Sequence, residues 1–301
     1  VWGNTRDDVA FFSARGQATL VPVHQIPNEQ ATPISSLTEL GRAEKIVGAL
    51  VLPHPAPGDD LPETFLTLVT SGGRIKRITL ADFVSAASRG AVTVMSVEDG
   101  DQLAWMVESS GQDELLLATR QGRAIRFSED DVRPMGLSAA GVWAIKLVKD
   151  DAVVGAGRAS DKGNLVIFTE KGYAKRTPAK QFPSQKRYGG GVQAAKLSSR
   201  SGKVAVAALA GEGDSLMLMA AKGRVTKLPV RAIHALGRAA AGYRSRSDTK
   251  EAYLDPSKHG PPALLTVLAG TKAAAKRAQA SAKAKRATRK PKRVRSAKSK
   301  S

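Results

Sequence analysis

Hydrophobic residues recur along the chain in short apolar runs, each followed by a glycine and then by a strand-like segment that contains basic residues. The runs read VAFF, FLTLV, LLLA, LVIF and LMLM, and the glycines after them are Gly16, Gly73, Gly122, Gly172 and Gly223. These glycines are 57, 49, 50 and 51 residues apart. Short apolar runs with polar flanks favour β-strands, and glycine accepts the positive φ of a hairpin turn. The pattern therefore predicts five β-hairpins at a fixed period, which is typical of a propeller.

A second series of glycines precedes further strand-like runs in four of the repeats. These glycines are Gly90, Gly141, Gly191 and Gly242, and the first repeat lacks an equivalent. Each repeat offers about four strands, the number in one propeller blade. We expect an all-β domain over residues 1–270, with blades at about 1–55, 62–110, 111–159, 160–210 and 211–270. The stretch 53–62 is rich in Pro, Gly and Asp and predicts a loop between the first two blades.

The net charge of +20 is unevenly distributed along the 301 residues. Residues 271–301 contain 13 Lys or Arg and no acid, so we expect a disordered basic tail after the propeller. Such a charge attracts polyanions, nucleic acid first and an anionic membrane surface second. No apolar run is long enough to span a bilayer, and the absence of cysteine excludes disulfides and thiolate metal sites. That absence fits a reducing cytosol. Because the chain begins at Val1, we expect it to be a fragment of a longer protein.

Basic residues recur in phase with the turns. Four residues after successive turn glycines stand Arg77, Arg126, Arg176 and Lys227, here called the in-phase bases, and only Leu20 breaks the series. Repeats around an axis place equivalent positions on one surface, so the series predicts a basic track along the rim that contacts DNA phosphates and not bases. The other interpretation is a solvated edge that discourages association between sheets. Further bases assigned to the DNA-binding surface are Arg74, Lys76, Arg89, Arg123, Arg133, Lys175, Lys180, Lys186, Arg187, Arg224, Arg231 and Arg238.

Catalytic and cofactor motifs are not evident. The four histidines, His24, His54, His234 and His259, are scattered without metal-ligand spacing. No P-loop, dinucleotide fingerprint or nucleophile elbow occurs. Aromatic residues make up 5% of the chain, which does not favour a stacking platform for single-stranded nucleic acid. The basic tail is open to two interpretations, a nucleic-acid-binding extension or a solubilising terminus.

Four passages carry a resemblance to the C-terminal domain of the A subunit of bacterial type IIA topoisomerases, the family of DNA gyrase and topoisomerase IV. They read FFSARGQATLVPVHQIP, GRIKRITLADF, GRAIRFSEDDVRPMGLSAAGV and GYAKRTPAKQFPSQKRYGGGV, and the match is collinear from about Asp8 to Leu268. The resemblance implies a six-bladed β-pinwheel whose blades exchange strands. Five repeats are visible, so the sixth blade, with the gyrase A box QRRGGKG, is expected upstream. The string QKRYGGG at 185–191 is interpreted as an ordinary loop, and gyrase is not distinguished from topoisomerase IV.

The resemblance also implies a function. It predicts a non-catalytic domain that wraps double-stranded DNA and presents a segment for strand passage and supercoiling. The implied partners are the ATPase B subunit, together with the cleavage core that lies upstream in the same polypeptide. ATP and Mg are expected elsewhere in the whole enzyme, and no cofactor is expected in this segment. The expected location is the cytoplasm, in association with the nucleoid and not with a membrane. Two alternatives stay open. A scaffold for proteins or acidic surfaces would show an exposed apolar or aromatic patch at the disc centre, with basic residues scattered off the rim. A propeller enzyme would need clustered acids and histidines in a central channel.

Overall fold

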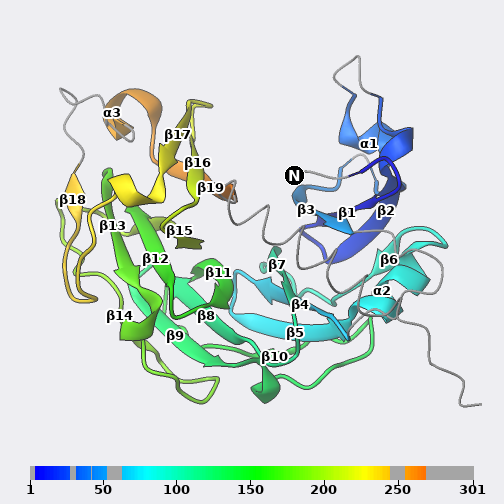
Figure 1. Cartoon of the computed structure of the whole chain (residues 1–301), viewed down its shortest axis with the longest axis horizontal. Helices are drawn as coiled ribbons and strands as arrows, with labels where there is room; N and C mark the ends of the chain where they lie inside the picture. Colours follow the sequence, from blue (N-terminus) through cyan, green and yellow to red (C-terminus); the bar gives the residue numbers. More distant parts are fainter. Residues whose placement is uncertain (1–3, 28–31, 42, 53–62, 245–254, 269–301) are drawn as a thin grey trace, which may run out of the picture.

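A computed structural model describes residues 4–27, 32–41, 43–52, 63–244 and 255–268 of the chain. Within these residues five small antiparallel sheets follow one another along an open arc, with the first and last at its two ends (Figure 1). The prediction of an all-β propeller with five visible blades is confirmed. The loop predicted at 53–62 and the tail predicted at 271–301 lie outside the described residues. No helix in the described part is long and apolar enough to cross a membrane.

Each blade is built on one of the predicted hairpins. Blade 1 comprises β1 (Asp8–Ser13), β2 (Gln17–Pro22), β3 (Ile46–Leu52) and β6 (Val92–Thr93). Blade 2 comprises β4 (Phe65–Thr70), β5 (Arg74–Thr79), β7 (Leu103–Ser109) and β10 (Val142–Trp143). Blade 3 comprises β8 (Glu114–Thr119), β9 (Arg123–Ser128), β11 (Val153–Ala159) and β14 (Val192–Gln193). Blade 4 comprises β12 (Gly163–Thr169), β13 (Tyr173–Pro178), β15 (Val204–Gly211) and β18 (Tyr243–Arg244). Blade 5 comprises β16 (Ser215–Ala220), β17 (Val225–Pro229) and β19 (Pro262–Leu268).

Short helices connect the strands. The α-helices are α1 (Ile34–Leu37), α2 (Leu80–Ala87) and α3 (Pro256–His259). The 3-10 helices are η1 (Val23–Gln25), η2 (Glu129–Asp131), η3 (Ala179–Gln181) and η4 (Val230–Ala232). The Thr79 side chain caps α2 by accepting a hydrogen bond from the backbone N of Asp82 at 3.1 Å.

The blades exchange strands, so the predicted continuous blade limits do not coincide with the sheets. In blades 1 to 4 the outermost strand has two residues and comes from the next repeat, as when β10 pairs with β5. The glycine before this strand lets it approach closely: a Cβ at Gly141, whose φ is +82°, would lie 2.5 Å from the Ile75 carbonyl oxygen. Blade 5 has three strands among the described residues. The strand exchange that the family resemblance implied is confirmed.

The core lies between consecutive blades because side chains alternate along each strand. In β8, Leu115 and Leu117 pack with the blade 2 residues Val69 and Ile75. The intervening Leu116 packs toward blade 4. Two buried faces explain why the hairpin strands read as unbroken apolar runs. The inner strands β3, β7, β11, β15 and β19 follow the inside of the arc, whereas β10, β14 and β18 lie on its outside (Figure 1).

Candidate functional site

Three loops form much of the outer rim of the arc. We call residues 132–141, 182–191 and 233–242 the rim loops; each runs from the end of a 3-10 helix to the outermost strand of the preceding blade. Each loop docks on the backbone of an in-phase arginine. The backbone N of Met135, Gln185 and Leu236 donates to the carbonyl oxygen of Arg77, Arg126 and Arg176 at 2.8, 2.8 and 2.9 Å, respectively. The repeat thus places a loop of one blade over the in-phase base of its neighbour.

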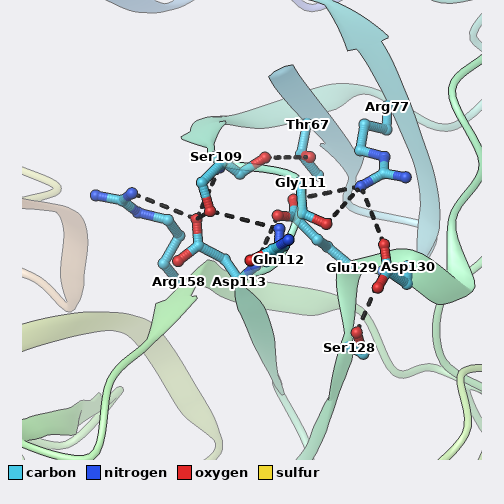
Figure 2. A network of polar contacts seen from close by, with 11 residues as sticks. Thr67, Arg77, Ser109, Gly111, Gln112, Asp113, Ser128, Glu129, Asp130 and Arg158 are labelled. Carbon is cyan, nitrogen blue, oxygen red and sulfur yellow. Dashed lines mark hydrogen bonds and ion pairs between the residues drawn. The ribbon is translucent and has the colours of Figure 1, made fainter. Parts of the chain in front are cut away.

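The guanidinium of Arg77 points into the protein. Its Nη1 lies 3.3 Å from the Gly111 carbonyl oxygen and 3.9 Å from carboxylate oxygens of both Glu129 and Asp130 (Figure 2). The Arg77 side chain is 7% exposed and Glu129 is fully buried. Glu129 also accepts a hydrogen bond from the backbone N of Asp113 at 2.7 Å. Arg77 therefore joins blade 2 to η2 of the next repeat.

Arg126 and Arg176 repeat this arrangement one and two blades later. Arg126 pairs with Glu114 and Asp161, and its Nη1 donates to the carbonyl oxygen of Ala179 in η3 at 3.2 Å. Arg176 donates from Nε to the Ile233 carbonyl oxygen at 2.8 Å and from Nη1 to Glu212 at 2.6 Å. Their side chains are 13% and 14% exposed. The three in-phase arginines are clamps between consecutive repeats.

Lys76 and Lys175 are buried beneath the rim loops. The Lys76 amine donates to the carbonyl oxygens of Val94, at 2.8 Å, and Leu137. The Lys175 amine donates to those of Gly237 and Arg238 at 2.9 and 2.7 Å. Burial lowers the pKa of each lysine from 10.5 to about 8, and for Lys175 the charge of Arg238 contributes.

The predicted placement of the in-phase bases on an open track is therefore wrong for most of them. Arg77, Arg126 and Arg176 are already paired, and the amines of Lys76 and Lys175 bind backbone carbonyls. Lys227 in blade 5 is exposed as predicted. The physical reason is that acids and carbonyl groups satisfy these bases, most of them from the next repeat, and the spacing of bases along one repeat does not reveal such contacts.

The remaining predicted bases are at the surface. The exposed members are Arg89, Arg123, Arg133, Lys180, Lys186, Arg224, Lys227 and Arg231, and Arg74, Arg187 and Arg238 are partly exposed. Arg133 and Lys186 lie on rim loops, with Lys186 paired to Asp131 at 3.1 Å. Arg123 donates to the carbonyl oxygens of Gly190 and Gly191 at 2.6 and 2.7 Å. Arg231 lies in the wall of a central cavity, so it does not belong to the rim.

Two exposed lysines of the rim escaped the sequence analysis. Lys146 and Lys196 follow the outermost strands β10 and β14, and their backbone N atoms donate to rim-loop carbonyl oxygens at Gly189 and Ala240, at 3.0 and 3.2 Å. The signal that identifies them is their position, five residues after Gly141 and Gly191. The rim bases are defined from here on as Arg123, Arg133, Lys146, Lys186, Arg187, Lys196 and Arg238.

A cavity of about 1010 Å³ lies against the inner strands β11, β15 and β19. Half of its wall residues are Ala or Gly, and the others include Leu209, Leu265 and Val267 together with the charged Arg158, Asp113, Asp214 and Arg231. Arg158 pairs with Asp113 at 3.4 Å (Figure 2). The scaffold alternative calls for an apolar or aromatic patch here; among the described residues the wall is mixed, with four charged side chains beside small apolar ones and Trp105 as its aromatic residue. Within the described ranges no three His, Cys, Asp or Glu side chains gather to hold a metal.

Comparisons with known proteins agree on one family. A family described as "DNA gyrase C-terminal domain, beta-propeller" matches residues 64–108, 113–160 and 163–209. The DNA gyrase A protein of Haloquadratum walsbyi is 35% identical over 245 residues, which are 79% of this chain and 28% of that protein. The corresponding protein of Salmonella typhimurium is 32% identical over 243 residues, 79% of this chain and 27% of that protein. The chain thus spans less than a third of the length of these relatives.

Solved structures show the same fold. The C-terminal domain of a DNA topoisomerase IV aligns with a TM-score of 0.77 at 22% identity, covering 92% of this chain and 85% of that one. A DNA gyrase A C-terminal domain aligns with a TM-score of 0.72 at 23% identity, covering 89% of this chain and 84% of that one. At these identities the likeness establishes the architecture of the blades.

Proposed function

Because the chain belongs to the family of DNA gyrase C-terminal β-propeller domains, we propose that it binds duplex DNA and wraps it around its rim. The observation that carries the proposal is the recurrence of exposed bases from blade to blade on the outside of the arc. The rim bases come from three successive repeats and lie on the rim loops or on strand segments that are hydrogen-bonded to them. A duplex following the arc would meet cations along its path.

The contacts are made to phosphates, so the binding is largely independent of base sequence. Each neutralised phosphate releases condensed counterions, which makes the affinity fall steeply with salt. Bending a duplex costs on the order of 1 to 10 kcal/mol per 20 to 30 bp, and several phosphate contacts per blade offset that cost. Lys146 and Lys196, at equivalent positions in successive repeats, would engage the duplex in the same way as it passes from one blade to the next.

The clamps serve this function indirectly. Arg77, Arg126 and Arg176 hold each blade to the next repeat, and Lys76 and Lys175 hold rim loops 132–141 and 233–242 from beneath. A rim held in this way presents its cations at fixed spacing, so the DNA bends to follow the rim and the protein does not deform. The in-phase arginines, which were predicted to contact phosphates, would thus support the exposed rim bases that make those contacts.

The domain would act within a larger enzyme. We propose that it serves the A subunit of an ATP-dependent type II topoisomerase and presents a DNA segment for strand passage and supercoiling. The cleavage core and the ATPase B subunit would be its partners, and ATP and Mg would bind there, with no cofactor in this segment. The enzyme would work in the cytoplasm, with the nucleoid. The basic residues 271–301 would extend or regulate the DNA contact.

The test is the topology of relaxed circular DNA after binding, nicking, ligation and protein removal. We expect the chain to shift the linking number, and a chain ending at residue 270 to do the same. A variant with Arg133, Lys146, Lys186 and Lys196 changed to Gln keeps the fold, because these side chains are exposed, and should lose the shift. Binding without a shift in the parent chain would reject wrapping. Equal shifts by the parent and the rim variant would reject the rim as the site.

A further inference from the structure

Two aromatic rings lie exposed among the rim bases. Trp143, on the outermost strand β10 of blade 2, is 40% exposed, and Tyr188, on rim loop 182–191, is 50% exposed. Their ring centroids are 6.5 Å apart at an interplanar angle of 31°. The rings come from different repeats and meet where blade 2 borders blade 3. We call them the aromatic pair.

The backbone at Tyr188 adopts a conformation that the other two rim loops do not share. Its φ is +65°, and Asp150 is the other non-glycine residue with positive φ in the described part of the chain. Such a φ is strained for a bulky side chain, because its Cβ crowds the backbone. The equivalent residues of the other rim loops, Ser138 and Ala239, do not have a positive φ. The positive φ is thus specific to loop 182–191, the loop that places the Tyr188 ring beside Trp143.

Hydrogen bonds fix the backbone that carries both rings. The backbone N of Tyr188 donates to the Ala144 carbonyl oxygen at 2.7 Å, next to Trp143 in the chain. Arg187 donates from Nη1 to the Trp143 carbonyl oxygen at 3.0 Å and from Nε to that of Asp131 at 2.9 Å. The Arg74 guanidinium stands over the Trp143 ring, 4.3 Å from its centroid. The aromatic pair therefore stands on a fixed backbone, and the Trp143 ring also contacts Arg74 and Tyr188.

Its surroundings indicate what it binds. Lys186 lies on loop 182–191. Arg123 donates to the Gly190 and Gly191 carbonyl oxygens of that loop, and the backbone N of Lys146 donates to the carbonyl oxygen of Gly189. Cations around an apolar platform suit a ligand that is anionic at its edges and aromatic or apolar between them. A duplex has this character, with phosphates flanking the sugars and base edges of its minor groove, and apolar side chains enter that groove where DNA bends around a protein.

We propose that the aromatic pair contacts the sugars and base edges in the minor groove of duplex DNA as it crosses from blade 2 to blade 3. The inference rests on the DNA binding proposed above and adds a second kind of contact to it. Phosphate contacts supply salt-dependent affinity, whereas this contact supplies affinity that salt does not screen. It also favours sites with flexible pyrimidine–purine steps at the crossing, because those steps unstack most easily.

The experiment compares the salt dependence of duplex binding among matched variants. Trp143→Gln introduces the residue found at the equivalent Gln193 of the next blade, and Tyr188→Asn introduces a residue that tolerates positive φ. We expect the double variant to bind a duplex of about 40 bp about tenfold more weakly at every salt concentration, with the slope of log K against log salt unchanged. Lys186→Gln, on the same loop, should instead reduce that slope by about 1. Trp143 emission, obtained as the difference between parent and Trp143→Gln, should be quenched by DNA.

The outcomes separate this inference from the function on which it rests. If the parent binds DNA and the folded double variant binds it equally, the aromatic pair is not a contact, while the rim proposal stands. A changed salt slope in the double variant would likewise overturn the inference, because it would mean that the rings act through phosphate contacts. If the parent chain does not bind duplex DNA, both proposals fail.

Discussion

Replacing Arg77 by Met should destabilise the protein strongly while leaving its phosphate contacts unchanged. Met keeps the apolar stem that packs near Phe65, over whose ring the guanidinium stands at 4.6 Å, and removes the charge. What remains is Glu129, fully buried and without its ion-pair partner. The exposed Asp130 can turn to water, so the cost falls mainly on Glu129.

The magnitude follows from the geometry. Two unit charges 3.9 Å apart, as for Arg77 and Glu129, attract by about 4 kcal/mol at an effective dielectric constant of about 20. Removing one partner of a buried pair costs about 3 to 5 kcal/mol, because the other charge stays desolvated. The lost hydrogen bond to the Gly111 carbonyl oxygen adds to this. We expect the free energy of unfolding to fall by about 3 to 5 kcal/mol.

Urea unfolding followed by far-UV circular dichroism measures this loss. Arg120→Met is the matched control, since Arg120 pairs with Glu170 at 2.8 Å on the surface and should cost less than about 1 kcal/mol. Adding Glu129→Gln to Arg77→Met removes the buried charge and keeps the acceptor for the Asp113 backbone N. The double variant should therefore be more stable than Arg77→Met alone. An Arg77→Met variant no less stable than Arg120→Met, or a changed salt slope of DNA binding, would refute the clamp.

Three further predictions concern the rim loops and what lies beneath them. Between pH 8 and 10.5 the unfolded chain binds more protons at Lys76 and Lys175 than the folded chain, so these lysines make stability rise with pH. In urea titrations, the free energy of unfolding of the parent minus that of the double variant Lys76→Met/Lys175→Met should rise by up to about 3 kcal/mol per lysine from pH 7.5 to 10.5. A difference that does not change with pH would contradict the burial argument. Gly141→Ala should cost more than about 2 kcal/mol of unfolding free energy, since its Cβ meets the Ile75 carbonyl oxygen, whereas Gly136→Ala, with open space around it, should cost almost nothing; equal costs would reject the close approach. Lys196→Gln should lower the salt slope of DNA binding by about 1, and Arg126→Met should not; the reverse would restore the in-phase bases as the phosphate contacts.

The blades were predictable because their signals are local. The turn glycines Gly16, Gly73, Gly122, Gly172 and Gly223 have φ between 76° and 89°, as a hairpin turn beside an apolar run requires. The second glycines were correctly associated with further strands, although the sheet that each strand joins was not apparent within one repeat. Pairing of β10 with β5 joins residues almost seventy positions apart, as Val142 with Ile75, and such a contact leaves no trace in local periodicity.

The site was only partly predictable. The sequence analysis assigned Arg133, Lys186 and Lys227 to the DNA-binding surface, and these are exposed, but it gave equal weight to Arg77 and Lys175, which are not. A charged residue looks the same in a sequence whether its partner is a carboxylate of the protein or a phosphate of a ligand. Tyr188 gave no sign of its positive φ, because that conformation depends on its contact with Ala144 and Trp143 from the preceding repeat.

The sequence by itself determined the repeat, the hairpins and the basic character of the chain, since turn chemistry and strand alternation act over a few residues. The tertiary structure decided which bases are free to bind. Exposure is set by what packs over each strand. Rim loops dock on the backbone of Arg77, Arg126 and Arg176, and acids outside those loops pair with the three guanidinium groups, while Lys146 and Lys196 stay in solvent. Burial is a property of neighbours in space, and in this fold the decisive neighbour of each blade is the repeat that follows it.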